Sequence, residues 1–249
     1  MSNVKLSVVT PVYNGEKTIE KTMKSVLSQG YDNLEYIIID GGSTDKTTAI
    51  VNSYIEKYGS IIKLVSEKDN GIYDAMNKGI GLATGEIVGI INSDDYYEPE
   101  AFDKIATAYA ALGRDTEYAI LYGAVRIIEN DKENAIILYS HNNLPKQMIM
   151  HQGCFVTRKL YEDKGTFSTE YRYSSDYEFM LRMYEDKDVV FKPVYELLAN
   201  FVLGGASGRG AAYLETHKLW YSKGYITKKK YNLVKTKVRV SKLLKRKRK

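Results

Sequence analysis

The sequence predicts an α/β protein in which helices flank a mainly parallel central sheet. Over the first hundred residues, four short, β-branched apolar runs alternate with segments of helical periodicity. Strands that alternate with helices of this length are typical of right-handed βαβ crossovers, and therefore of parallel strands. Polar turns containing glycine, Ser or Thr separate strand from helix, where glycine permits a tight bend and a hydroxyl can cap. A chain of 249 residues with 44% hydrophobic residues suits one large domain with a small appendage.

The elements of the first half follow from their periodicity. Ile19, Met23 and Val26 recur at helical spacing, and Ile50, Val51 and Tyr54 do the same in the second helical segment. Pro99 indicates the start of a further helix, because proline is tolerated at the first helical position. The pattern predicts strands over 5–10, 35–39, 61–65 and 86–91, and helices over 16–28, 45–58, 72–83 and 100–112.

The second half is typical of a different arrangement. Short strand-like runs lie at 118–122, 125–128 and 135–139, with a turn at 129–131 that favours antiparallel pairing. We therefore expect a small antiparallel sheet in this half. A further strand is expected at 189–191, helices at 176–185 and 211–221, and a flexible glycine-rich loop at 204–208. No linker separates the halves, so residues 1–224 are expected to form one domain, with 225–249 as a tail.

Charge and cysteine content limit the classes of protein to which this chain can belong. The net charge of +5 conceals an asymmetry, because residues 225–249 hold twelve Lys or Arg and no acid, while the rest holds 24 basic and 31 acidic residues. The single cysteine, Cys154, excludes an internal disulfide and a multi-cysteine zinc site. No apolar run has the length of a membrane span, and residues 1–5 lead directly into a strand without a signal peptide. We therefore expect a cytosolic protein.

The turn at 92–95 is the strongest single indication of chemistry. An apolar strand ends there in Asn92, Ser93, Asp94 and Asp95. Hard cations such as Mg²⁺ and Mn²⁺ take oxygen ligands and are usually shared with substrate phosphates. Adjacent carboxylates at a strand end therefore suggest nucleotide chemistry. The alternative is that both Asp residues only end a strand, since Asp favours turns.

Three other polar segments are expected at the same edge of the sheet. In open parallel sheets, ligands bind beyond the carboxyl ends of the strands, and segments 10–14, 40–44 and 68–71 each follow a predicted strand. Each also has a structural alternative: Tyr13 as a loop aromatic, Asp40 as support for the Gly-Gly turn, and 68–71 as an ordinary turn into a helix.

These motifs together resemble those of family 2 glycosyltransferases, which have the GT-A fold. The similarity covers roughly residues 4–210 and rests on the order and spacing of the motifs. They are T-P-V-Y-N at 10–14, D-G-G-S-T-D at 40–45, G-I-Y-D-A-M-N-K-G at 71–79, A-T-G at 83–85, N-S-D-D at 92–95, S-D-Y-E at 175–178 and G-G-A-S at 204–207. The resemblance implies a nucleotide-sugar half at 1–98 and an acceptor half at 99–224.

The resemblance also implies residue roles for the donor. Tyr13 matches the aromatic residue that stacks on the base, and Asp40 the carboxylate that bonds it. Asp95 is expected to bind Mn²⁺ or Mg²⁺ directly, with Asp94 at the ribose or as a possible further ligand. Asn92 stands where the family often has Asp, which departs from the pattern. The full expected nucleotide-sugar set is Pro11, Tyr13, Asn14, Asp40, Lys68, Asp69, Gly71, Asn77, Asn92, Ser93 and Asp94.

On the acceptor side the resemblance implies that Asp176 is the catalytic base. A carboxylate can take the proton of the attacking hydroxyl, and family members usually invert the anomeric centre in one displacement. The alternative for Asp176 is a helix N-cap, and Glu178 is the second candidate base. His151, Gln152 and Arg209 are expected acceptor or substrate contacts. His217 could reach the metal only from a C-terminal helix, and no second ligand accompanies it at metal-site spacing.

The tail at 225–249 has three possible roles. On a helical wheel Tyr231, Val234 and Val238 share one face, and a second face holds Leu233, Val240 and Leu244. A solvated, partly helical tail is the simplest interpretation. Attachment to anionic phospholipid is favoured over nucleic-acid binding, because aliphatic residues are interleaved with the cations.

The sequence as a whole therefore predicts a metal-dependent glycosyltransferase on the inner face of the membrane. It would move a sugar from a UDP- or dTDP-sugar to a glycan acceptor, lipid-linked, in bacterial surface polysaccharide synthesis. A nucleotidyltransferase is an alternative, although 41–46 fits a triphosphate loop poorly. A non-catalytic nucleotide-sugar-binding scaffold is another alternative. Hydrolysis of UDP-sugars in the presence of Mn²⁺ would distinguish an enzyme from such a scaffold.

Overall fold

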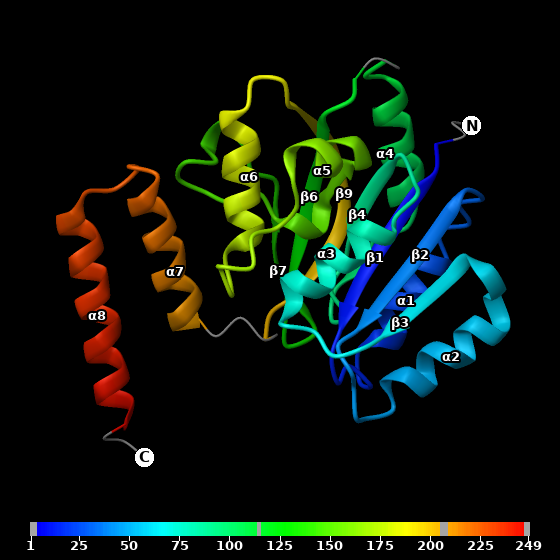
Figure 1. Cartoon of the computed structure of the whole chain (residues 1–249), viewed down its shortest axis with the longest axis horizontal. Helices are drawn as coiled ribbons and strands as arrows, with labels where there is room; N and C mark the ends of the chain where they lie inside the picture. The colour runs from blue at the N-terminus through cyan, green and yellow to red at the C-terminus, as the bar shows by residue number, and fades with distance from the viewer. Residues whose placement is uncertain (1–3, 114–115, 205–208, 247–249) are drawn as a thin grey trace.

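The computed structural model describes residues 4–113, 116–204 and 209–246, and the side chains of 209–210 and 240–246 lie outside that description. Within these ranges one mixed sheet is flanked by helices on both faces (Figure 1). The strands are β1 Leu6–Val12, β2 Leu34–Asp40, β3 Ile62–Ser66, β4 Ile87–Ile90, β5 Tyr96–Tyr97, β6 Ala119–Glu129, β7 Lys132–Ile137, β8 Cys154–Thr157 and β9 Val190–Val202. The helices are α1 Ile19–Leu27, α2 Thr47–Tyr58, α3 Ile72–Leu82, α4 Ala101–Ala110, α5 Arg158–Lys164, α6 Ser175–Glu185, α7 Arg209–Ser222 and α8 Lys228–Arg246.

The strand order is β3-β2-β1-β4-β8-β6-β9-β5, with β7 paired to β6. The strands β3, β2, β1 and β4 are parallel to one another, as predicted. The antiparallel strands do not form a separate small sheet, because β8 pairs with β4 on one side and β6 on the other. The two halves of the chain therefore share one continuous sheet.

Alternation along the strands divides the core into two layers. Leu6 and Val8 of β1 pack with α1, α2 and α4 on one face of the sheet. Val9 points to the other face, which α3, α5 and α6 cover. Because successive strand side chains point to opposite faces, strands buried on both sides are apolar at nearly every position, which is why they were recognisable in the sequence.

Two strands of the second half are longer than predicted. The expected strands at 118–122 and 125–128 are one strand, β6, with register shifts between Tyr122 and Val125. The strand expected at 189–191 continues to Val202 as β9. Proline and several polar residues, among them Lys192 and Pro193, interrupt the apolar pattern of this strand. Its backbone pairing with β6 nevertheless extends along most of the strand. Neither the two-residue strand β5 nor the helix α5 was expected.

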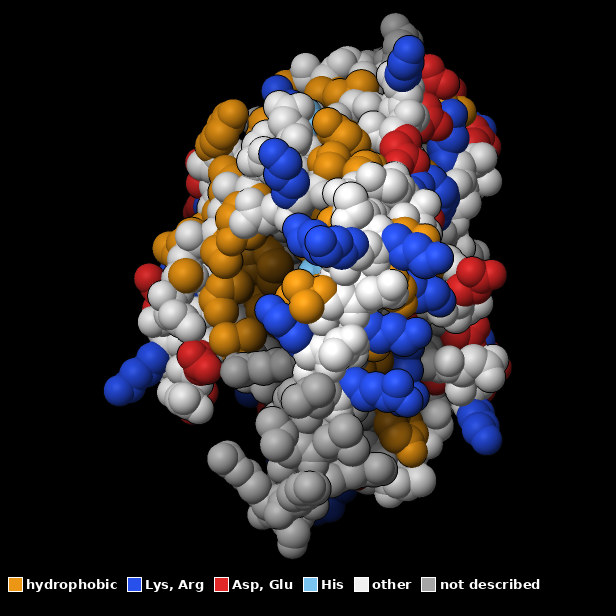
Figure 2. Space-filling model, turned by 90° about the vertical axis from the view of Figure 1, so that its left-hand side faces the viewer, with side chains coloured by type: hydrophobic (Ala, Val, Ile, Leu, Met, Phe, Trp, Pro, Cys, Tyr) orange, Lys and Arg blue, Asp and Glu red, His pale blue; other side chains and the backbone are white. Residues whose placement is uncertain are grey.

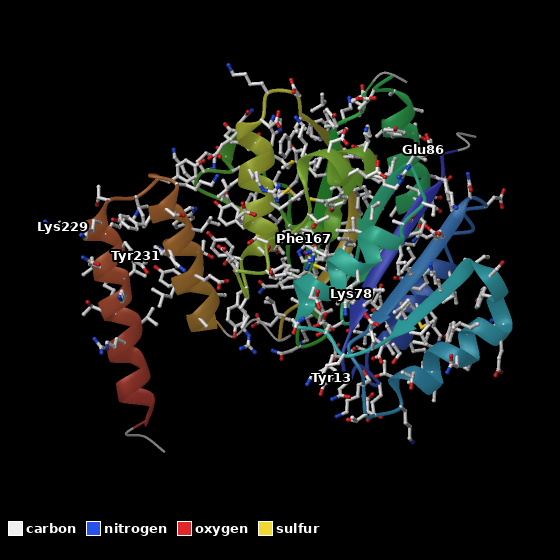
Figure 3. All side chains as sticks on the ribbon, viewed as in Figure 1. Tyr13, Lys78, Glu86, Phe167, Lys229 and Tyr231 are labelled. Atoms are coloured by element: carbon white, nitrogen blue, oxygen red, sulfur yellow. The ribbon has the colours of Figure 1, made fainter. Side chains whose placement is uncertain are left out.

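The tail forms a helix that packs against the helix before it. Val234 is buried, and the ring of Tyr231 stacks on Tyr221 with centroids 5.2 Å apart (Figure 3). Tyr231 and Val234 belong to the first of the two faces expected from the wheel, so that face meets α7. Leu233 of the other face is 56% exposed. In the described ranges no helix combines the length and apolarity needed to cross a membrane.

Candidate active site

The register of the parallel strands brings the polar segments to one edge. Val12 lies opposite Asp40, and Asp40 lies opposite Ser66, so β1, β2 and β3 end together. Val9 of β1 pairs with Ile90 of β4, which places the 92–95 turn beside the end of β1. The four predicted segments are therefore neighbours at the carboxyl edge of the sheet, where Tyr13 lies at the rim (Figure 3).

The turns after β1 and β2 are bonded to each other. The backbone N–H of Asn14 donates to Ser43 Oγ at 2.7 Å, and the N–H of Thr44 donates to Asn14 Oδ1 at 2.8 Å. Asn14 adopts a left-handed conformation with φ of 51°, which Asn tolerates. The adjacent Tyr13 side chain is 63% exposed. A rigid turn thus presents an aromatic ring to solvent, where it is able to stack on a base.

Asp40 supports the Gly-Gly turn in this structure. Its carboxylate is fully buried, accepts from the backbone N–H of Ser43, and accepts from Ser66 Oγ at 2.6 Å. This geometry corresponds to the structural alternative for Asp40 and shows no exposed oxygen for a base. Asp69 lies against Gly41, since an added Cβ there would come within 2.4 Å of Asp69 Oδ2. Lys68 is exposed beside it.

The two carboxylates after β4 have different surroundings. Asp95 is fully buried, and it accepts hydrogen bonds from the Val202 N–H at 2.9 Å, from Gln152 Nε2 at 2.9 Å and from Asn92 Nδ2 at 3.3 Å. Burial, together with the charge of Asp94, raises the pKa of Asp95 to about 7. The Asp94 carboxylate is half-buried and, among the described residues, has no hydrogen bond to another residue. Burial also raises the pKa of Asp94.

The predicted metal ligand, Asp95, is the more enclosed of the two carboxylates. Its Oδ2 accepts two hydrogen bonds and its Oδ1 accepts one, whereas Asp94 accepts none from another described residue. Within the described ranges no group of three His, Cys, Asp or Glu could hold a metal. A divalent cation often takes only one or two protein carboxylates and completes its shell with phosphate and water. The half-buried Asp94 fits an ion held in that way, and the same turn carries the buried oxygen Asn92 Oδ1, which has no hydrogen-bond partner in the described structure.

Asp176 lies in the same hydrogen-bonded group as this turn. Ser174 occupies the N-cap position of α6, so Asp176 is in the first turn and is not the cap. Tyr73 Oη donates to Asp176 Oδ1 at 2.9 Å, and His151 Nδ1 lies 3.2 Å from Asp176 Oδ2. Burial and the Asp176 charge raise the pKa of Tyr73, so its hydroxyl remains a donor. His151 Nε2 is in turn 3.4 Å from Asn92 Nδ2.

Tyr73 is the participant that the sequence did not reveal. It belongs to the 71–79 motif, but its helical spacing with Met76 and Ile80 indicates only a buried face. The hydroxyl group was the available signal, because a buried tyrosine usually bonds a partner through it. Which partner it finds depends on a residue 103 positions away.

Several predicted residues have structural contacts elsewhere. The Asn77 side chain bonds both the N–H and the carbonyl of Phe167, which ties α3 to that loop. Glu178 pairs with Arg182 one turn along α6. His217 is buried between Tyr213 and Trp220 in α7.

The remaining predicted contacts lie in or near the donor segments. Pro11 is a buried residue of β1, Gly71 precedes α3 with φ of 116°, and Ser93 lies next to Gly15. The side chain of Arg209 falls outside the described residues, as does the 205–208 part of the predicted loop.

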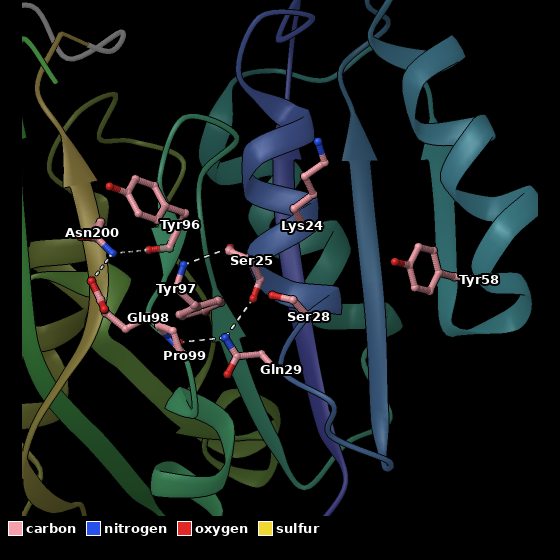
Figure 4. Close-up of a pocket in the computed structure, with 10 residues that line it drawn as sticks. All are labelled: Lys24, Ser25, Ser28, Gln29, Tyr58, Tyr96, Tyr97, Glu98, Pro99 and Asn200. Atoms are coloured by element: carbon pink, nitrogen blue, oxygen red, sulfur yellow. Dashed lines mark hydrogen bonds between the residues drawn. The ribbon is translucent and has the colours of Figure 1, made fainter.

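A pocket of about 510 Å³ lies apart from these groups, on the α1 face of the sheet (Figure 4). Ser25 of α1 and Gln29, which follows this helix, line it together with Tyr96 to Pro99, and Gln29 Nε2 donates to the Glu98 carbonyl at 2.8 Å. It contains none of the predicted site residues. Its walls carry no carboxylate pair, so the chemistry belongs to the strand ends and not to this pocket.

Comparison with known proteins agrees with this geometry. The sequence model of the family described as "Glycosyl transferase family 2" matches residues 7–165 of the chain. A relative from Mycobacterium tuberculosis, "PGL/p-HBAD biosynthesis glycosyltransferase", is 28% identical over 203 residues, which cover 81% of this chain and 78% of that protein.

Two solved structures share the fold. S. aureus TarS 1–349 in complex with UDP-GlcNAc matches with a TM-score of 0.68 at 17% identity, over 92% of this chain and 70% of TarS 1–349. The mannosyltransferase PcManGT from Pyrobaculum calidifontis, in complex with GDP-Man and Mn²⁺, matches with a TM-score of 0.66 at 21% identity, over 90% of this chain and 65% of that one. The match to the family covers most of the chain and includes the strand-end turns described above, so this protein belongs to glycosyl transferase family 2 and is a glycosyltransferase of the GT-A fold.

Proposed function

We propose that this protein transfers a sugar from a UDP- or dTDP-sugar to a hydroxyl group of a glycan, with inversion in a single displacement and Asp176 as the general base. The main support is the hydrogen-bonded group that joins Asp176, through His151 and Asn92, to the carboxylate turn after β4. Asp176 and the turn at 92–95 are more than 80 residues apart in the chain, and hydrogen bonds connect them in the fold. The UDP-GlcNAc complex of TarS adds support for a nucleotide-sugar donor.

For the donor, we propose that Tyr13 stacks on the base while Asp40 holds the turn that Asn14 and Ser43 complete. Asp94 would be the protein ligand of a Mn²⁺ or Mg²⁺ ion shared with the diphosphate, and Asp95 would hold the turn in place. When bound, such an ion stabilises the negative charge that develops on the leaving nucleoside diphosphate. The Mn²⁺ in the PcManGT structure supports this assignment.

For the acceptor, Asp176 Oδ1 accepts from Tyr73 Oη and from the Tyr177 N–H, while Oδ2 has His151 as its one protein donor and keeps a further lone pair. Tyr73 and His151 orient the carboxylate, and a free lone pair can take the proton of an attacking sugar hydroxyl. The residues flanking Asp176 are tied to α7, because Glu215 accepts from the backbone N–H groups of Arg172 and Tyr173. The C-terminal helices therefore lie on the side of the structure that carries α6 and Asp176 (Figure 1).

We further propose that α8 attaches the enzyme to an anionic membrane on the cytoplasmic side, where a lipid-linked acceptor in polysaccharide synthesis would be found. Lys and Arg side chains gather on the face that includes this helix, next to a hollow lined by hydrophobic side chains (Figure 2). Leu233 is exposed between Lys229, Lys230 and Lys237, which is the pattern of an interfacial helix.

The function is tested with Asp176→Asn and, as a control, Asp103→Asn on the exposed side of α4. In a nucleotide-release assay with UDP-sugars, Mn²⁺ and saccharide acceptors, Asp176→Asn should lower kcat about 10²- to 10⁴-fold. The affinity for UDP should stay near the wild-type value, because the base does not contact the nucleotide. Near-normal turnover in Asp176→Asn would exclude this base, and the lack of any Mn²⁺-dependent thermal shift with UDP or dTDP would contradict the donor class.

A further inference from the structure

The short helical turn at His151–Gly153, η3, bridges the two carboxylates of the site. His151 lies against Asp176, and the next residue, Gln152, donates to Asp95 at 2.9 Å. The side chains of His151 and Asp176 are only 13% and 11% exposed. Little of the imidazole is thus available to an acceptor sugar, and its two ring nitrogens both face protein groups.

The partners of Asn92 decide which ring nitrogen carries the proton. Asn92 Nδ2 lies 3.3 Å from Asp95 Oδ2 and 3.4 Å from His151 Nε2. An amide nitrogen donates and cannot accept, and Asp95 offers it a carboxylate oxygen. The nitrogen that faces it on the ring, Nε2, must therefore be the acceptor and carry no proton.

The proton of the neutral ring then resides on Nδ1, which is the atom 3.2 Å from Asp176 Oδ2. Nδ1–H donates to the carboxylate from one side while Tyr73 Oη donates from the other. The two side-chain donors to Asp176 originate in different elements, η3 and α3, and the backbone N–H of Tyr177 also donates to Oδ1 at 2.9 Å. The carboxylate therefore cannot rotate without losing hydrogen bonds.

The amide at position 92 is essential to this arrangement. A carboxylate there would accept from the ring, so the single proton would move to Nε2 or the ring would take a second one. In the first case the lone pair of Nδ1 would face the Asp176 carboxylate and repel it.

We propose that Asn92 and His151 are positioning residues: the Asn92 amide fixes the Nδ1–H tautomer of His151, and that N–H aims the Asp176 carboxylate at the acceptor hydroxyl. This inference rests on the proposed function for its catalytic consequence, but the tautomer itself is independent of it. His151 and Gln152 thus serve the carboxylates and not the acceptor directly.

The tautomer is measured by ¹⁵N NMR of the full chain labelled at histidine, which contains only His141, His151 and His217. Loss of one set of signals in His151→Asn assigns the ring. We expect a protonated Nδ1 and an unprotonated Nε2 in the wild type, and a protonated Nε2 in Asn92→Asp. Asn52→Asp makes the same chemical change on the exposed side of α2 and should leave the His151 signals unchanged.

The catalytic consequence is measured with two substitutions that replace different ring nitrogens. The amide nitrogen of Asn can occupy the place of Nδ1, whereas that of Gln reaches the place of Nε2. His151→Asn should therefore keep kcat within about tenfold of the wild type, and His151→Gln should lose about 10²-fold, the size of effect that misplacing a reacting group causes. The KM for the nucleotide sugar should change little in either.

A wild-type His151 protonated at Nε2, or an unchanged tautomer in Asn92→Asp, would overturn the proposal. Equal loss of kcat in His151→Asn and His151→Gln, with both proteins folded by circular dichroism, would also overturn it. If the wild-type protein showed the Nδ1–H tautomer but transferred no sugar from any donor, the proposed function would be refuted instead.

Discussion

Three aspartates show how the surroundings of a side chain set its role. Asp95 is fully buried and accepts from three nitrogens, Asp94 is half-buried without a partner residue in the described structure, and Asp176 is held by Tyr73, His151 and the Tyr177 N–H. A fully buried carboxylate held by protein donors organises structure, because its oxygens do not reach solvent. A carboxylate with accessible lone pairs can bind an ion or take a proton.

We predict that the two carboxylates of the turn separate in their effects. Asp94→Asn should weaken UDP binding in the presence of Mn²⁺ and leave the free energy of unfolding nearly unchanged. Asp95→Ala should instead reduce stability by about 1–3 kcal/mol or more, because it leaves buried donors without an acceptor. Calorimetric titration and urea unfolding measure the two quantities. Full Mn²⁺-dependent affinity in folded Asp94→Asn would assign the ion to other ligands.

Among the elements, α3 makes the most connections around the site. Its Tyr73 reaches Asp176, its Asn77 bonds the Phe167 backbone, and its Gly79 meets β1. A Cβ added at Gly79 would come within 2.2 Å of Val9 Cγ1, so the glycine allows the helix to lie close to the sheet. The distance between α3 and the sheet determines where Tyr73 is placed.

Two glycines of α3 give a matched pair of substitutions. Gly79→Ala should destabilise the protein by about 1–3 kcal/mol, because Val9 is buried and cannot give way freely. Gly81→Ala, where nothing lies within 4 Å of the added Cβ, should stabilise by about 0.5–1 kcal/mol through helix propensity. Urea unfolding of both variants measures the difference, and changes of the same sign would contradict the close contact.

A second prediction at this scale concerns His141, in the short helix His141–Asn143, η2. Its Nδ1 is 2.8 Å from Tyr122 Oη and its ring stacks on Phe191, and burial lowers the pKa of His141. Below about pH 6.5, the ordinary histidine value, the unfolded chain therefore binds a proton that the folded chain refuses. Stability should fall as the pH drops through this range.

In His141→Gln this part of the pH dependence should disappear. Urea unfolding at pH 7.5, 6.5 and 5.5 would give a shallower slope than in the wild type, with a difference of at most one proton. The control is Asn142→Gln, because Asn142 is an exposed neighbour of His141 in η2 and its replacement should leave the slope unchanged. His217→Gln is unsuitable as a control, because that ring is packed in α7. A slope equal to the wild-type one in His141→Gln would refute the assignment.

For the whole molecule, the basic C-terminal helix is connected to the catalytic region through α7. α8 packs on α7 through Val234 and Tyr231, and α7 bonds the segment before Asp176 through Glu215. Attachment of α8 to a lipid surface would therefore present the acceptor side of the site to that surface. The acidic body and the basic tail then have separate partners.

We predict that α8 binds vesicles that contain anionic lipid. In sedimentation with phosphatidylglycerol vesicles, replacing Lys228, Lys229 and Lys235 together by Gln should weaken binding by about 10²-fold, since each cation contributes about 1 kcal/mol. Binding should also weaken with salt, because the Debye length shortens. Replacing Lys17, Lys57 and Lys63 of the body is the matched control. Equal binding to pure phosphatidylcholine would contradict an electrostatic attachment.

The sequence alone determined the parallel half of the fold and the polar turns at the ends of its strands. Strands buried on both faces are apolar throughout, so β1, β2 and β4 were evident, and the turns that follow such strands must lie at one edge. The polar strand β9 was underestimated, because its backbone pairing with β6 continues through Lys192 and Pro193, and local residue patterns do not report pairing of that kind.

Only the tertiary structure decided the surroundings of each carboxylate in this group. Asp94 and Asp95 are identical neighbours in the sequence, and Asp95 becomes buried and hydrogen-bonded because Val202 and Gln152 approach it from distant elements. In the same way Tyr73 and His151 reach Asp176 only after α3, η3 and α6 have packed together. A hydrogen bond depends on distance and direction between atoms, and these are set by long-range packing that the local order of residues does not contain.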